Sequence, residues 1–142
     1  MGTVRYHDDM AHAMLDALAT RANAASPCKF KYYSGTMPAT PTTAITSQVL
    51  LATLPCSATI ETGPASSRTL TFDAITTDSA GDADGVTSFV GLVDDDDVVL
   101  FYTDAGNLAS SAGVKMTNTT IASGAPVAAT SFTISVPVTI TF

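Results

Sequence analysis

The chain has 142 residues, a length that fits one domain with a core of its own. Hydrophobic residues make up 46% of it and charged residues only 13%, so Thr, Ser and Asn supply much of the polar surface. The formal net charge is -7 with six Lys and Arg, which argues against nucleic acid and anionic membranes, since both bind clustered basic residues. This composition favours β-sheet and a surface that is partly covered in an assembly.

No segment of the sequence is typical of a targeting signal or a membrane anchor. The first residues lead through Asp8 and Asp9 into a helical pattern and do not resemble a signal peptide. No apolar run approaches the roughly 20 residues that a membrane-spanning helix needs. We therefore expect a protein that is made in a cytoplasm and does not contact a membrane.

Residues from about Tyr6 to Ala25 carry the one helical pattern of the sequence. Asp8 and Asp9 stand at its start, where carboxylates cap free N–H groups, and Asn23 and Pro27 mark its end. The apolar stripe, at spacings of three and four, consists of Met10, Met14, Ala17, Leu18 and Arg21. Such a helix must lie against its own sheet or a neighbouring subunit, and we take this stripe as the candidate subunit contact.

After Pro27 the hydrophobic period changes from 3.6 to 2, which is typical of strands. The expected extended segments are Cys28–Tyr33, Gln48–Leu54, Ala58–Ile60, Arg68–Ile75, Val86–Val93, Val98–Thr103 and Phe132–Phe142. The last of them carries the clearest signal, six apolar residues in strict alternation with polar residues or Pro137, so one face should be buried. Pro137 cannot donate to a ladder, so the strand should bend there or pass between sheets.

These segments predict a mainly β fold, an antiparallel β-sandwich of the Ig-like or jelly-roll-like kind with one N-terminal α-helix. Its expected divisions are residues 1–27, an N-terminal helix or arm, and residues 28–142, the β-sandwich domain.

The run from Asp94 to Asp97 is the most conspicuous chemical feature. Carboxylates on a tight turn could hold a hard cation such as Ca²⁺, but the run lacks the alternating ligands, Gly and distal Glu of an EF-hand. We favour a solvated hairpin tip that also discourages edge-to-edge aggregation. Asp78, Asp82 and Asp84 form a second acidic loop with the same two readings.

The sequence offers little catalytic chemistry. His7 and His12 are five residues apart and do not share a helical face, so they do not form a zinc pair. Cys28 and Cys56 lack a CxxC pattern, and we favour two buried thiols over a disulfide. Glu61 is the lone Glu, and neither a nucleophile elbow nor a phosphate loop is present. We therefore expect no enzyme, no cofactor and no metal site.

The order of features nevertheless resembles a known group of proteins. The stretches that carry this likeness are Asp16–Leu18, Tyr32–Gly35, Met37–Ala39, Leu50–Leu54, Val90–Asp94 and the closing Ser/Thr/Val strand. Over nearly the whole chain this pattern is similar to small structural proteins of tailed bacteriophages, some of which resemble capsid cement (decoration) proteins.

The resemblance implies a virion protein that stabilises the assembled head. Its partners would be the major capsid protein and copies of itself, in a homo-oligomer such as a trimer, held by many weak contacts. The N-terminal helix would be the segment that binds a neighbouring subunit. Two alternatives stay open: a tail or fibre component involved in host attachment, which should carry an exposed aromatic platform, and a secreted adhesin-like sandwich, which should carry an export signal.

Overall fold

The computed structural model describes residues 2–23, 28–56, 68–73, 75–129 and 131–141, and it is mainly β with one helix near the N-terminus. The elements in chain order are β1 (Thr3–Arg5), α1 (Asp8–Ala22), β2 (Lys29–Ser34), β3 (Val49–Pro55), β4 (Thr69–Asp73), β5 (Gly85–Val86), β6 (Phe89–Val93), β7 (Val99–Asn107), β8 (Val114–Met116), β9 (Thr120–Ile121), β10 (Ser131–Ser135) and β11 (Thr139–Thr141). The predicted fold class is confirmed, with a curled multi-stranded sheet consistent with a β-sandwich. The expected segment Ala58–Ile60 lies outside the described residues.

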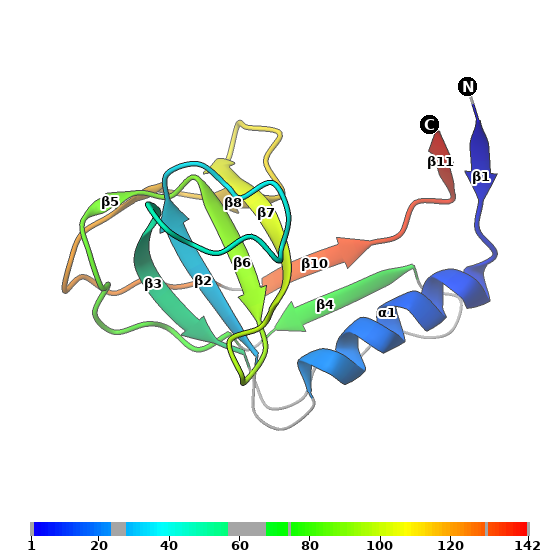
Figure 1. Cartoon of the computed structure of the whole chain (residues 1–142), viewed down its shortest axis with the longest axis horizontal. Coiled ribbons are helices and arrows are strands. Elements are labelled where there is room, and N and C mark those ends of the chain that lie inside the picture. Colours follow the sequence, from blue (N-terminus) through cyan, green and yellow to red (C-terminus); the bar gives the residue numbers. More distant parts are fainter. Residues whose placement is uncertain (1, 24–27, 57–67, 74, 130, 142) are drawn as a thin grey trace.

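The largest sheet has the order β3-β2-β6-β7-β8 (Figure 1). Its pairs are antiparallel except for β7 and β8, which run parallel. β6 lies in the middle and is buried at all five positions, because side chains cover both of its faces. The register shifts between Tyr32 and Tyr33 and again between Leu92 and Val93, and such irregularities increase the local twist. The sheet therefore curls.

The outer edge of β3 is covered by the chain that follows β4. The Asp82 N–H donates to the Leu51 carbonyl over 2.8 Å, and the Thr76 N–H donates to the Pro55 carbonyl over 2.7 Å. The short pair β5–β9 and the bridge between Asp78 and Val127 hold this covering layer in place. An edge that would otherwise expose unpaired backbone groups is thereby closed.

A second part of the molecule extends away from the large sheet, and we call it the arm. It consists of α1, the two-stranded ribbon β4–β10 and the terminal ribbon β1–β11. In Figure 1 the helix runs beside β4, and the two chain ends lie side by side at the far tip. The arm therefore combines the N-terminal segment with the C-terminal one.

The arm and the sheet share one hydrophobic core. Leu15, Ala19 and Ala22 of α1 join the same buried cluster as Leu54 of β3 and Leu92 of β6. At the junction, the ring of Phe30 makes T-shaped, edge-to-face contacts with Phe72 at 5.5 Å and Phe132 at 5.4 Å between ring centroids, and Phe72 and Phe132 are tilted to each other. The helix is thus a structural part of the fold, and its removal would open the core.

The alternating C-terminal segment differs from the expectation in one respect. It breaks into β10 and β11 around Pro137, and the two pieces pair with different strands, as Pro137 predicted. However, the prediction of one buried face holds only in part, because Phe132, Ile134 and Val136 are half-buried against the core, whereas Val138 is 58% exposed. The physical reason is that β10 and β11 lie in two-stranded ribbons, which a second layer covers incompletely.

The start of the helix also differs in detail from the prediction. His7, rather than Asp8 or Asp9, is the N-cap residue, and its Nδ1 accepts the Asp9 N–H over 3.2 Å. Asp8 and Asp9 lie in the first turn, where their charge still meets the positive end of the helix dipole. The helix ends at Asn23, whose N–H donates to the Ala19 carbonyl.

Candidate functional site

The stripe expected to contact a partner lies mostly on the outside of α1. Met10 is 55% exposed and Met14 46% exposed, and Ala17 is also exposed. Leu18 is half-buried against the core, and Arg21 is exposed. The helix therefore presents two large, flexible apolar side chains to the surroundings, which is typical of adaptable contact surfaces.

A neighbouring face of the same helix, which sequence reasoning missed, packs on the protein itself. It consists of Ala11, Leu15, Ala19 and Ala22, all buried. These residues have the same helical spacing as the predicted stripe, so periodicity alone does not rank the two faces. The small alanines allow α1 to lie close to β4, and the bulkier methionines remain outside.

The terminal ribbon carries further exposed apolar side chains near the chain ends. Val4 of β1 is 40% exposed, and Val138, just before β11, is 58% exposed. Within the described residues, each strand of this ribbon pairs only with the other, so both outer edges are open. A lone two-stranded ribbon is marginally stable in water, so a partner that pairs with or covers it would stabilise it.

Arg68 fastens this ribbon to the rest of the arm. Its guanidinium donates to the Asp8 carboxylate at 2.7 Å, to the Pro137 carbonyl at 3.2 Å and to the Tyr6 carbonyl. The Arg68 side chain is only 16% exposed, whereas the Asp8 side chain is 54% exposed, so the ion pair is partly accessible to water. Sequence reasoning had no signal for this residue beyond its place at the start of a strand.

Asp94 corrects the expectation of a solvated acidic tip. Its side chain is 1% exposed, and Oδ1 accepts the N–H groups of Asp96 at 3.0 Å and Val98 at 2.9 Å. Its Oδ2 pairs with the guanidinium of Arg21 on the helix. A carboxylate can be buried when hydrogen bonds and a paired cation compensate its charge. The Asp94 carboxylate has both, and its ion pair with Arg21 links the end of β6 to α1. Arg21 is therefore engaged within the chain.

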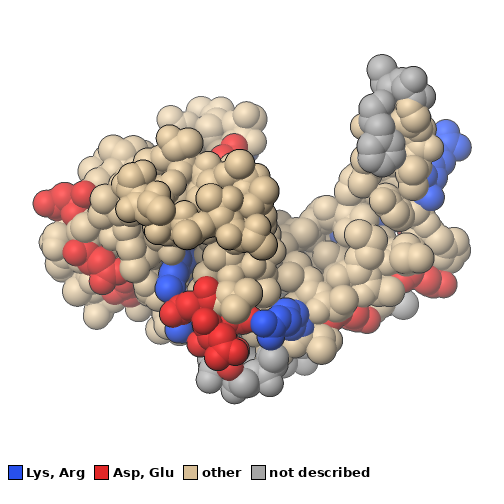
Figure 2. Space-filling model, viewed as in Figure 1, with Lys and Arg blue, Asp and Glu red and all other residues tan. Residues whose placement is uncertain are grey.

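Asp97 closes the same turn in a different way. Its backbone φ of 61° lies in the left-handed region, and its carboxylate meets Lys31 Nζ at 2.8 Å and Lys29 Nζ at 3.6 Å. The hydrogen bond from Lys31 holds the pKa of Asp97 below its ordinary value. Figure 2 shows acidic side chains beside basic ones in the region of the β6–β7 turn. Two of the four carboxylates of the acidic run, Asp94 and Asp97, thus have structural partners in the chain.

The second acidic loop is also held by hydrogen bonds, which its carboxylates accept from backbone N–H groups. Asp78 accepts the N–H groups of Thr53 at 2.9 Å and Ala80 at 3.1 Å, and Asp84 accepts the Ser123 N–H at 2.8 Å. These carboxylates shape loops around the covered edge of β3. In the part of the chain that the structure describes, no three His, Cys, Asp or Glu residues gather as a possible metal site.

The histidines and cysteines are separate from one another. His12 Nε2 lies 3.2 Å from Asp16 Oδ2 on the helix, while His7 serves as the cap. Cys28 and Cys56 are both buried free thiols, as expected.

Among the described helices, none is long and apolar enough to cross a membrane.

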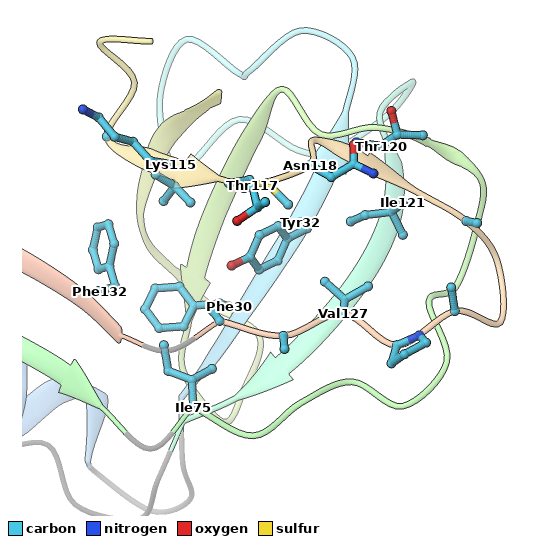
Figure 3. Close-up of a pocket in the computed structure, with 18 of the residues that line it drawn as sticks. Phe30, Tyr32, Ile75, Lys115, Thr117, Asn118, Thr120, Ile121, Val127 and Phe132 are labelled. Carbon is cyan, nitrogen blue, oxygen red and sulfur yellow. The ribbon is translucent and has the colours of Figure 1, made fainter. Parts of the chain in front are cut away.

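An open groove of about 710 Å³ runs along the sheet beside β8 and β9 (Figure 3). Phe30 and Phe132 lie at one end, Tyr32 in the middle and Ile121 towards the other end. Burial raises the pKa of Tyr32 to about 12, so this hydroxyl stays protonated at neutral pH. Within the described lining, Lys115 is the one charged side chain, and the other side chains are apolar or carry hydroxyl or amide groups.

Comparisons of the chain with protein-family models, with curated proteins and with solved structures find no match. The candidate functional site is therefore defined by geometry alone, and it is the outer surface of the arm.

Proposed function

We propose that this chain is a non-enzymatic structural subunit of a phage-like particle, a cement or decoration protein that binds the outside of an assembled head. Its partners are the major capsid protein and further copies of itself. The observation that carries the proposal is the arm, which combines both chain ends in one extension with open strand edges and exposed apolar side chains.

The exposed apolar residues of the arm support this function. Among the described residues, four of the nine large exposed hydrophobic side chains lie on the arm, namely Val4, Met10, Met14 and Val138, and the other five lie on the sheet and its loops. Each adds little on its own, at about 1.5–3 kcal/mol when fully buried. A repeated lattice multiplies such contacts, which is how a coat of small subunits stabilises a shell.

The character of the remaining surface agrees with a binding role. Most of the face in Figure 2 carries neither basic nor acidic side chains, and the charged groups near the β6–β7 turn pair with one another. Among the described residues, the large exposed hydrophobic side chains are Val, Met and Leu, without an exposed aromatic platform of the kind that a glycan-binding fibre would use. This favours a shell component over a host-attachment component.

The test is electron microscopy of particles assembled with and without this chain. We expect extra density on the outside of the head, at regular lattice positions, which disappears when the gene is deleted. The deleted particles should also lose their DNA at a lower temperature. Density on the tail would support the tail or fibre component instead, and particles without any density for the chain would overturn both assignments.

A further inference from the structure

Two cysteines far apart in the sequence face each other across neighbouring strands. Cys28 directly precedes β2 and Cys56 directly follows β3. The register pairs Lys29 with Pro55 and Phe30 with Leu54, so one further step places Cys28 opposite Cys56. The Cys56 N–H indeed donates to the Cys28 carbonyl over 2.8 Å. The two residues are therefore a cross-strand pair whose side chains lie on the same face of the sheet.

This placement meets the geometric requirement for a disulfide. Directly opposed residues that share backbone hydrogen bonds in an antiparallel pair have Cα atoms about 5.5 Å apart. Disulfides span Cα separations of roughly 4.4–6.8 Å, so neither strand has to move. Both side chains belong to the hydrophobic core, with Cys28 0% and Cys56 3% exposed.

We propose that Cys28 and Cys56 form a reversible disulfide site, closed by exchange with a low-molecular-weight disulfide such as oxidised glutathione. This site is independent of the proposed function, because it depends only on the β2–β3 pairing.

The chemistry requires two exchanges. The Cys28 thiolate attacks one sulfur of oxidised glutathione, forms a mixed disulfide and releases one glutathione thiolate, which takes up the proton that Cys28 lost. The Cys56 thiolate then attacks Cys28 Sγ, breaks the mixed disulfide and releases the second glutathione. Two protein thiols are oxidised and one glutathione disulfide is reduced to two thiols.

The order of attack follows from the contact between the two thiols. A hydrogen bond from the Cys56 thiol stabilises the Cys28 thiolate and lowers the pKa of Cys28, whereas the same contact and burial raise the pKa of Cys56. This contact favours Cys28 as the first nucleophile, and the net exchange is the same when Cys56 attacks first. Since both sulfurs are buried, the exchange proceeds through local opening and is slow in the native protein.

The disulfide would join Cys28, directly before β2, to Cys56, directly after β3. The bond closes the loop from Cys28 to Cys56 and so restricts the unfolded chain. It should raise the midpoint of thermal unfolding by about 5–15 °C. It should form when the protein passes from a reducing to an oxidising medium.

The experiment incubates the native, reduced chain with oxidised glutathione for several days and then counts free thiols with a maleimide in denaturant. We expect a loss of two mass units, no alkylated thiols, and a higher midpoint that dithiothreitol reverses. The matched control combines Pro55→Cys with Cys56→Ser. It keeps two thiols but places them on opposite faces of the sheet, so both should stay free or carry glutathione.

Three outcomes would overturn the proposal. The first is that both thiols of the native chain remain alkylatable. The second is that oxidation yields only glutathione adducts or dimers linked between chains. The third is that the control closes as readily as the native chain, which would show that the opposed positions do not matter. The Cys28→Ala variant serves as a fold check, since it removes the site while the circular dichroism of the sheet should be retained.

Discussion

Arg68 donates from Nε to Oδ1 of Asp8 over 2.7 Å, which joins the first turn of α1 to the start of β4, 60 residues away in the sequence. The same guanidinium also binds the carbonyls of Tyr6 and Pro137, next to β1 and β11. The Arg68 side chain thus connects the terminal ribbon β1–β11 to α1 and β4. The terminal ribbon is consequently a defined element that a partner can recognise, rather than two separate tails.

Replacing Arg68 should loosen the arm more than the rest of the molecule. Arg68→Ala removes a largely buried cation from Asp8 and from backbone carbonyls, so the free energy of unfolding should fall by about 1–3 kcal/mol. Amide hydrogen exchange should accelerate first in β1 and β11. Arg5→Ala is the control, because Arg5 is exposed and its effect should stay within about 0.5 kcal/mol. Equal effects of the two variants would contradict the role of Arg68.

The buried carboxylate of Asp94 should matter far more than its acidic neighbours. Asp94→Ala leaves two N–H groups and Arg21 without their acceptor, so urea denaturation should show a loss of about 2–4 kcal/mol. Asp96→Ala, at an exposed position of the same turn, should change stability by less than about 0.5 kcal/mol. A double-mutant cycle with Arg21→Ala measures the coupling, and additive effects would show that the ion pair is unimportant.

We expect Asp97 to make a small, pH-dependent contribution to the free energy of unfolding. Lys31 lowers the pKa of Asp97 in the folded state below its ordinary value of 3.8. A carboxyl whose pKa is depressed on folding stabilises the protein fully above the unfolded pKa, and this contribution is lost as the pH falls through the folded pKa. The loss should therefore occur below about pH 4.

The check is an NMR titration of the Asp97 carboxyl in the native protein and in Lys31→Met. The pKa should lie below 3.8 in the native chain and rise in the variant. Because the Asp97 side chain is 56% exposed, salt should reduce the difference. An identical pKa in both proteins would show that Lys31 does not hold the carboxylate.

The strongest sequence patterns predicted the main elements of the fold. β2, β3, β6 and β7 were expected because each is a run of apolar, aromatic or β-branched residues, and Pro137 correctly marked the passage from β10 to β11. β8 and β9 were missed, since strands of two or three residues among polar neighbours carry no measurable periodicity. Their pairing depends on tertiary contacts.

The contacts of the charged residues could not be predicted from spacing. Asp94 looked like part of a solvent-exposed run, and its burial depends on Arg21, which lies 73 residues earlier in the sequence. Arg68 likewise stands alone in its sequence context. On α1, the outward stripe with Met10 and the inward face with Leu15 have equal helical periodicity, so only the packing against β4 distinguishes them.

The exposed methionines should contribute to binding without contributing to folding. The structure makes helix deletion a poor test, because α1 is part of the core, whereas Met10→Glu with Met14→Glu changes only exposed positions. We expect unchanged thermal unfolding and at least tenfold weaker binding to assembled heads, since two apolar side chains lose their burial.

The matched control is Ala13→Glu with Thr20→Glu. It adds the same charge at exposed positions of α1 that lie outside the stripe, and it should bind normally. Both variants can be compared by co-sedimentation with heads that lack the native chain. Equal binding by the two variants would exclude the methionines from the contact.

The most direct test of the structural role is the number of copies of this chain in each purified particle, measured by quantitative mass spectrometry against the major capsid protein. A cement protein that occupies the head lattice should be present in hundreds of copies, at a fixed ratio to the capsid subunit. A count of a few copies per particle, or none, would contradict the account.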